Sequence, residues 1–222
     1  MAVSNGEGSR RRWLGVMTGA LASLGGLVAM RAHSSGNSAG TGGADKGAGH
    51  SKHDSPHEAF HRVMQETVAR QQIMELRQAY GVATDLIGKN TTAEIEAGRA
   101  IYRRIFTPDA SIGAATVESV TGPDAWVDIV KDALASYNKT QHLIGTQYIT
   151  GLTLPDDADA GGSAHMSSYL QAWHSDAKQE LWLFMGTYED DLVWTKAQGW
   201  QIRSMVLHQT AADYRRLGKG PD

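Results

Sequence analysis

Residues 164–208, with the sequence AHMSSYLQAWHSDAKQELWLFMGTYEDDLVWTKAQGWQIRSMVLH, decide the fold of this chain. They contain three runs rich in β-branched and aromatic residues, a composition typical of strands. A fourth run precedes them, and the turn clusters Pro155–Gly162 and Thr195–Gly199 separate neighbouring runs. The four expected strands cover residues 141–154, 164–174, 180–193 and 200–208. Because consecutive strands with short connections pair antiparallel, the second half of the chain predicts an antiparallel sheet.

The sequence before this sheet has helical periodicity. Apolar residues recur at three- and four-residue spacing over 56–87, which predicts a long first helix. Two more helices are expected at 93–106 and 123–137, with a short strand at 110–115 between them. This order predicts an α+β fold, in which three N-terminal helices pack on a strongly curved, mostly antiparallel sheet. Such a sheet can curl into a cone that encloses a pocket.

Composition excludes several classes of function. The chain has no cysteine, which rules out disulfides, thiolate chemistry and zinc–cysteine sites. Its formal net charge is −3, and four arginines but only two acids precede Lys46, so the charge from Lys46 onward is −5. With no basic stripe in that region, nucleic acid is not expected as a partner.

The N-terminus has the pattern of a targeting segment. Residues 9–14, SRRRWL, resemble a twin-arginine export signal, and an uncharged Gly- and Ala-rich stretch follows to Met30. We expect residues 1–32 to be this signal, with a retained membrane anchor as the alternative. The predicted segments after it are a disordered Gly/Ser-rich tether at 33–55, the folded domain at 56–215 and a tail at 216–222. The expected location is periplasmic or extracellular.

Two histidines at the start of the first helix raise the question of a metal. His57 and His61 are four residues apart, so they share a helix face and could hold an ion. A solvated helix start is the alternative, because no carboxylate pair accompanies them. We therefore expect no metal site and no cofactor.

Four polar residues in an apolar setting indicate chemistry: Tyr80, Asp85, His142 and His174. A carboxylate, two imidazoles and a phenol can move a proton off carbon and onto a leaving oxygen. On a helix Tyr80 and Asp85 lie roughly 140° apart, so both reach one cavity only if Asp85 is in the last turn. The alternatives are a core aromatic for Tyr80, a cap or solvated acid for Asp85, and structural histidines.

Strand alternation assigns faces to the two histidines. It places His142 with Ile144, Thr146 and Tyr148, and it places His174 with Leu170 and Ala172. Further aromatic side chains are candidates either for pocket walls or for ordinary core packing: Trp126, Tyr169, Trp173 and Trp182.

The chain resembles the SnoaL-like group of the nuclear-transport-factor-2-like superfamily, including scytalone dehydratase and bile-acid dehydratase relatives. Four stretches carry the resemblance, which covers about residues 70–210. They are LRQAY at 76–80 with Ala83 and Asp85, IFTPDA at 105–110, TQHLIG at 140–145, and GTYED at 186–190 followed by GWQI at 199–202. The chain differs from the dehydratase pattern at Thr84 and Ala114, where tyrosines are usual, which argues against scytalone itself as substrate.

The resemblance implies roles for the four residues. Asp85 would orient His142, which would act as general base and then as general acid. Tyr80 would donate a hydrogen bond to a developing oxyanion, and His174 would be the second histidine at the far end of the pocket. The implied function is a cofactor-independent lyase, dehydratase-like, that acts on a hydrophobic cyclic or aromatic hydroxylated metabolite.

Other functions of the same fold remain open at this point. The same groups could catalyse isomerisation or retro-aldol cleavage. A non-catalytic module for small-molecule binding or oligomerisation, or the small subunit of a ring-hydroxylating dioxygenase, would share the architecture. A homodimer or homotrimer is expected from the resemblance, and a membrane is a partner only if the signal stays uncleaved.

Overall fold

The computed structural model describes residues 55–115, 117–155 and 161–216. Within these ranges the elements are α2 (Pro56–Ile87), α3 (Thr92–Ile105), β1 (Phe106–Ala114), β2 (Val117–Thr121), α4 (Pro123–Leu134), β3 (Lys139–Thr153), β4 (Gly162–Ser175), β5 (Glu180–Thr195) and β6 (Gly199–Arg216). The expected export signal and nearly all of the expected tether lie outside the described residues. No helix in the described part of the chain is long and apolar enough to cross a membrane.

The six strands form one mixed sheet in the order β2-β1-β6-β5-β4-β3. The pairs from β3 to β6 are antiparallel, as the short connections predict, and β1 pairs antiparallel with β2. Among the described strands, only the pairing of β1 with β6 is parallel. The described part of the chain therefore has the predicted α+β arrangement, with three helices and a mostly antiparallel sheet.

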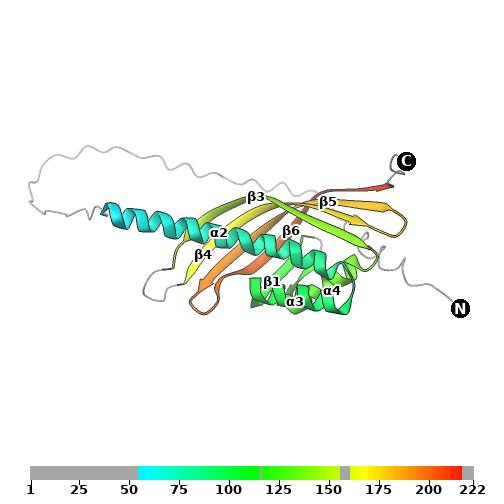
Figure 1. Cartoon of the computed structure of the whole chain (residues 1–222), viewed down its shortest axis with the longest axis horizontal. Coiled ribbons are helices and arrows are strands. Elements are labelled where there is room, and N and C mark those ends of the chain that lie inside the picture. The colour runs from blue at the N-terminus through cyan, green and yellow to red at the C-terminus, as the bar shows by residue number, and fades with distance from the viewer. Residues whose placement is uncertain (1–54, 116, 156–160, 217–222) are drawn as a thin grey trace, which may run out of the picture.

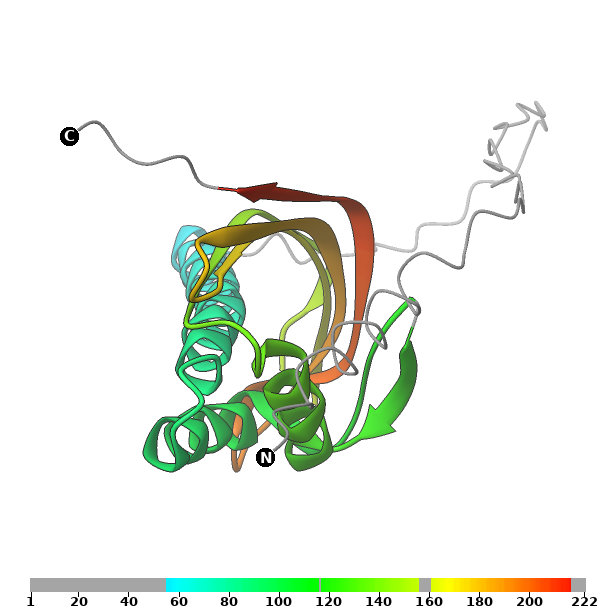
Figure 2. The same cartoon turned by 90° about the vertical axis from the view of Figure 1, so that its right-hand side faces the viewer.

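Several strands contain irregularities that change their direction. The register shifts in β5 between Met185 and Gly186 and again between Asp191 and Leu192, and in β3 it shifts between Gly145 and Tyr148. Such bulges bend a strand and increase its twist. Figure 2 shows the ribbons of β4, β5 and β6 curving toward the side of the sheet that the helices occupy.

Helix α2 runs along the sheet and organises the core (Figure 1). It begins with a capping box, in which the side chain of Ser55 accepts from the Glu58 backbone and Glu58 accepts from the Ser55 backbone. In its second half, Ile73 and Ile87 are fully buried against the sheet and α3. At its N-terminal end the apolar side chains are exposed, and Phe60 retains 62% of its accessible surface.

Some boundaries differ from the sequence expectation. Strand β1 begins at Phe106, directly after α3, and includes the segment expected as the helix end. Strand β2 was not predicted, because its sequence VESVT is short and mostly exposed at the sheet edge. Strand β6 continues to Arg216, well past the predicted end at 208, because its polar second half pairs with the first residues of β5. Pairing partners decide these limits, not the pattern of apolar residues.

Candidate functional site

Asp85 and His142 form a hydrogen-bonded pair where the end of α2 meets β3. Helix α2 ends at Ile87, so Asp85 lies in its last turn, the condition under which it was expected to reach the cavity. Its Oδ1 is 2.8 Å from Nδ1 of His142. The carboxylate also accepts from the backbone N–H of His142 at 3.2 Å and from the hydroxyl of Thr140 at 2.9 Å. The carboxylate is thus fixed by three donors from one strand.

These contacts keep Asp85 ionised and fix the position of the proton on Nδ1 of His142. Burial raises the pKa of Asp85, but the hydrogen bonds and charge of His142 and the hydrogen bond of Thr140 outweigh it, so the net pKa lies below the usual range. An ionised carboxylate can only accept, so Nδ1 of His142 carries the proton. Nε2 is then the basic nitrogen. The side chain of His142 is only 7% exposed, against 30% for Asp85.

His174 lies beside this pair on the inner face of β4, 3% exposed. Its ring centroid is 5.2 Å from that of His142, and its Nδ1 is 3.2 Å from the carbonyl oxygen of Trp182. Burial, followed by the charge of His142, lowers the pKa of His174 to about 3. The ring is therefore neutral near pH 7. Because Nδ1 donates to the carbonyl, Nε2 of His174 is a hydrogen-bond acceptor.

Tyr80 is both a core aromatic and part of the pocket wall. Its side chain is 2% exposed, and its ring stacks on Tyr102 with centroids 5.0 Å apart. The indole N–H of Trp126 donates to its hydroxyl at 3.0 Å. Burial raises the pKa of Tyr102 and Tyr188 well above the usual tyrosine range, and the neighbouring phenol of Tyr80 raises both further, first through electrostatics and then through hydrogen bonding. Tyr80 is thus the centre of a buried phenol network.

Three of the four predicted site residues, Tyr80, His142 and His174, line one pocket between α2, α4 and the sheet, and Asp85 does not. Its wall is mainly apolar, and the lining residues include no Lys, Arg, Asp or Glu. The hollow measures about 540 Å³ together with its solvent-open part. The structure therefore brings two imidazoles and a phenol into an apolar pocket, with the carboxylate behind one imidazole.

The candidate wall aromatics divide into two groups. Trp126 and Trp182 line the pocket. Tyr169 and Trp173 do not, since they alternate with the inward-facing residues of β4 and remain 57% and 36% exposed on the opposite face. Tyr169 and Trp173 are separated from His174 by an odd number of positions along β4, so strand alternation places them on the opposite face. The same alternation could have been read from the sequence.

The prediction that Thr146 and Tyr148 share the face of β3 that carries His142 is wrong. His142 and Ile144 point to the helices, but Tyr148 is 68% exposed. The backbone of Thr146 has φ of 44°, and the register with β4 shifts there, so the residues that follow change faces. Gln147 points inward instead and donates to the backbone oxygen of Met74 at 2.9 Å.

Sequence reasoning missed residues that support the site. Thr140 was visible only as the neighbour of His142, and its hydrogen bond to Asp85 depends on how α2 approaches β3. Tyr188 lies in a stretch used for the family resemblance, yet its place in the pocket wall was not predicted. No local pattern marked the buried pair of Arg77 and Asp190, which are 113 residues apart.

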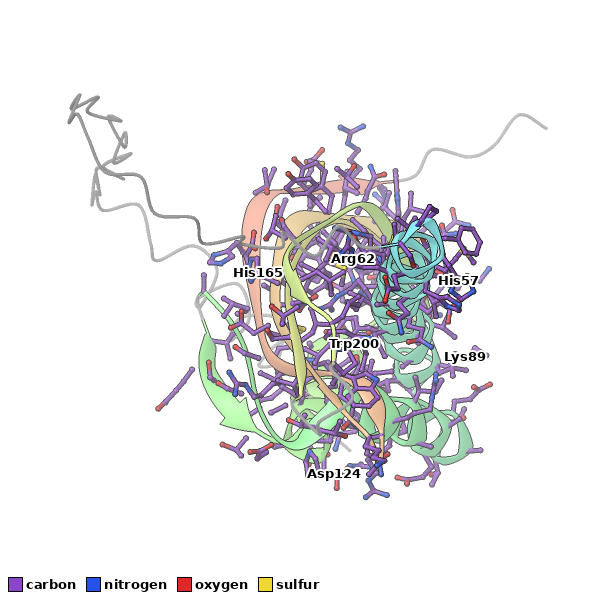
Figure 3. The ribbon with its side chains drawn as sticks, turned by 90° about the vertical axis from the view of Figure 1, so that its left-hand side faces the viewer. His57, Arg62, Lys89, Asp124, His165 and Trp200 are labelled. Atoms are coloured by element: carbon purple, nitrogen blue, oxygen red, sulfur yellow. The ribbon has the colours of Figure 1, made fainter. Side chains whose placement is uncertain are left out.

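The other histidines of the described ranges do not line this pocket. The rings of His57 and His61 are 4.4 Å apart on α2, and no group of three or more potential metal ligands occurs in the described ranges. His165 bridges two carboxylates on the outer face of the sheet, Asp191 at 3.1 Å and Glu189 at 2.9 Å. Figure 3 shows His165 and His57 on opposite sides of the molecule.

A second hollow, of about 690 Å³ together with its solvent-open part, lies near the N-terminal half of α2. Met64 and Val68 form one wall, and Trp194 and Trp200 form the other. Its one titratable lining residue is His61, so it lacks an acid–base pair.

Solved structures with the same fold include enzymes. A proposed scytalone dehydratase from Novosphingobium aromaticivorans has 18% identity and a TM-score of 0.55, covering 70% of this chain and 93% of its own. The dehydrochlorinase LinA-type3 of Novosphingobium barchaimii, which acts on hexachlorocyclohexane by name, has 11% identity and a TM-score of 0.56, covering 72% and 99%. A proposed aromatic ring hydroxylase from Novosphingobium aromaticivorans has 18% identity and a TM-score of 0.52, covering 67% and 94%.

At these identities the likeness to solved structures establishes the fold alone. No curated protein is significantly similar to the chain in sequence. The family model of the SnoaL-like domain, however, matches residues 65–206, which hold both members of the Asp85–His142 pair and most of the described fold. The chain therefore belongs to the SnoaL-like domain family.

Proposed function

We propose that the domain is a cofactor-independent acid–base lyase. The observation that carries this proposal is the 2.8 Å contact between His142 and an ionised Asp85 at the wall of an apolar pocket. Nε2 of His142 takes a proton from a carbon next to a carbonyl, and Asp85 stabilises the resulting imidazolium. The enolate then expels a β-hydroxide, which leaves as water with the proton that His142 returns. One C–H and one C–O bond break, and a C=C bond forms.

The pocket supports a neutral, hydrophobic, hydroxylated ring as the substrate. A charged carboxylate or phosphate would find no cationic side chain among the lining residues. Nε2 of His174 can accept a hydrogen bond from a substrate hydroxyl, and Tyr80 can donate to the developing oxyanion. The hollow reaches about 540 Å³ only with its solvent-open part, so a bound ring would extend into that open part.

Elimination is preferred to isomerisation or retro-aldol cleavage within this proposal. Two proteins of the same fold are named as a dehydratase and a dehydrochlorinase, both of which eliminate a small molecule. Their identities to this chain are 18% and 11%, so their names guide the choice of assay and not more.

The test is turnover of a panel of hydroxylated cyclic ketones by purified wild type and variants. We expect kcat to fall about 10²–10⁴-fold in His142→Ala and about 10²-fold or more in Asp85→Asn. His208→Ala and Asp128→Asn, both exposed, are matched controls that retain wild-type turnover. Full activity in both dyad variants would exclude this mechanism.

A binding or assembly module is the second candidate, and the outer face of the sheet favours it. Leu143, Tyr169 and Trp173 are exposed together on β3 and β4, away from the helices. A homodimer or homotrimer through this face is compatible with either function, since none of these three residues lines the pocket.

We also propose that the twin-arginine-type signal at residues 9–14 exports the domain.

A further inference from the structure

A fully buried ion pair lies directly behind the pocket wall. Arg77, on α2, and Asp190, on β5, have no exposed side-chain surface. Nε of Arg77 donates to Oδ2 of Asp190 at 3.0 Å, and Nη2 donates to Oδ1. Neither residue lines the pocket. The pair therefore joins the helix that carries Asp85 to the centre of the sheet without touching a bound substrate.

The guanidinium of Arg77 is enclosed by two pocket-lining phenols. Its central carbon is 4.6 Å from the ring centroid of Tyr80 and 4.0 Å from that of Tyr188. These rings meet edge to face, 5.4 Å apart. The remaining contact is weak, from Nη1 to the sulfur of Met205 at 3.4 Å. The phenols thus separate a permanent positive charge from the pocket.

Packing alone does not explain why a cation is buried here. Removing two charges from water offsets most of their attraction, and apolar residues of similar volume commonly stabilise a core equally well. A cation over a phenol face, in contrast, is attracted by the ring electrons and polarises them. This cation–π interaction is strongest where water is excluded. The effect reaches the pocket through the hydroxyl of Tyr80, which Trp126 already orients.

We propose that Arg77 and Asp190 are positioning residues that make the Tyr80–Tyr188 wall selective for negative charge on a bound oxygen. This inference rests on the proposed function, because an enolate or phenolate oxygen is the group that such a wall would stabilise. Arg77 supplies the field, and Asp190 fixes the guanidinium against both rings through its two hydrogen bonds. The ligand class is an aromatic or enolic oxyanion on an otherwise apolar ring.

The main variant replaces both partners, Arg77→Met with Asp190→Leu, so that no charge is left buried alone. Arg77→Lys is a second variant, which keeps a cation but loses the two-point contact. The matched control is Arg103→Met with Asp124→Leu, which removes an exposed pair of the same two-point geometry, 2.8 and 2.9 Å, outside the pocket lining. Circular dichroism and thermal unfolding first establish that each variant is folded.

The measurement compares binding of two probes of similar shape, 4-nitrophenolate and neutral nitrobenzene, at one pH where the phenol is ionised. We expect wild type and the surface control to prefer the phenolate. The double variant should lose about tenfold in phenolate affinity and less than about twofold in nitrobenzene affinity, with Arg77→Lys in between. Any contribution of His142 to phenolate binding is shared by all variants and cancels.

Three results would overturn the inference. They are equal affinities of the two probes for wild type, an unchanged phenolate preference in the double variant, and an equal loss for both probes. If the double variant does not fold, an unaltered phenolate affinity in Arg77→Lys together with an altered nitrobenzene affinity also overturns it. None of these results depends on turnover, so they leave the dyad mechanism untouched. Conversely, full turnover in the dyad variants would end the lyase proposal and leave the oxyanion preference standing.

Discussion

Two histidines whose rings are 5.2 Å apart have different hydrogen-bonding roles because their partners differ. His142 faces an ionised carboxylate, which fixes a ring proton on Nδ1. His174 faces a neutral carbonyl in a buried setting, and its pKa falls to about 3. The proposed elimination assigns proton transfer to His142, whereas the neutral His174 stays a hydrogen-bond acceptor.

The buried neutral state of His174 predicts an acid-sensitive fold. In the unfolded chain an imidazole has a pKa of about 6.5, so between about pH 6.5 and pH 3 the unfolded state binds a proton that the folded state does not. Stability therefore falls as the pH falls through this window and is unaffected above it. Relative to His174→Gln, we expect wild type to lose about 1.4 kcal/mol of unfolding free energy per pH unit below about pH 6.

Urea unfolding between pH 4 and pH 8 provides the measurement. His165→Gln is the matched control, because the hydrogen bond to Asp191 leads the contacts that raise the pKa of His165. A raised pKa gives stability that is complete at low pH and is lost as the pH rises. Relative to His165→Gln, the unfolding free energy of wild type should therefore fall as the pH rises, which is the opposite of the trend expected relative to His174→Gln. Parallel pH profiles for wild type and His174→Gln would show that His174 is not buried in its neutral form.

At the scale of elements, the close approach of α2 to β3 creates the dyad. The C-terminal part of α2 lies against β3 because two glycines leave room, Gly81 within the helix and Gly88 at its C-cap. A Cβ at Gly81 would lie 3.2 Å from the backbone oxygen of His142, and one at Gly88 would lie 2.6 Å from the hydroxyl of Thr140. The carboxylate of Asp85 therefore reaches β3 only because these neighbours have no side chain.

Gly88→Ala is predicted to separate Thr140 from Asp85. The backbone of Gly88 has φ of −63°, which alanine adopts without strain, so the effect comes from the contact and not from the conformation. We expect a loss of about 1–3 kcal/mol in unfolding free energy, as for other overpacked sites. Turnover should fall with the loss of the Thr140 hydrogen bond.

Gly145→Ala, in the strand β3 that also carries Thr140, is the control for this prediction. A Cβ there meets nothing within 4 Å, so its unfolding free energy should stay within about 0.5 kcal/mol of wild type. Urea unfolding measures both variants. Equal stability of Gly88→Ala and Gly145→Ala would mean that α2 is not held as close to β3 as the structure shows.

At the scale of the whole molecule, the two faces of the sheet have different roles. The inner face carries the pocket and the helices, whereas the outer face of β3 and β4 exposes Leu143, Tyr169 and Trp173. An exposed group of large apolar side chains on one surface is typical of an association site. The proposed dimer or trimer places this surface, which contributes no residue to the pocket lining, between subunits.

Tyr169→Lys is therefore expected to shift the protein toward the monomer. A lysine in the centre of this face would be desolvated by association, which costs more than the lost contact. Light scattering after size exclusion measures the shift at several protein concentrations. Val82→Lys, at a 58% exposed apolar position on α2, is the control that should keep the wild-type mass. An unchanged mass for Tyr169→Lys would place the subunit contact elsewhere.

The sequence by itself determined the order and type of most elements. Periodicity over 56–87 predicted α2 to the residue, and the four β-rich runs predicted β3 to β6, because apolar spacing is set by local backbone geometry. It also predicted that His174 shares a face with Leu170 and Ala172, since strand alternation is local as well. Strand β2 and the end of β6 were not predictable, because pairing partners decide them.

Only the tertiary structure decided which of the candidate residues meet. The hydrogen bond between Asp85 and His142 spans 57 positions, and the pair of Arg77 and Asp190 spans 113. The turn of β3 at Thr146, which places Tyr148 in solvent, likewise depends on its register with β4. Spacing along a chain specifies direction within one helix or strand, whereas distance between elements follows from how their side chains pack.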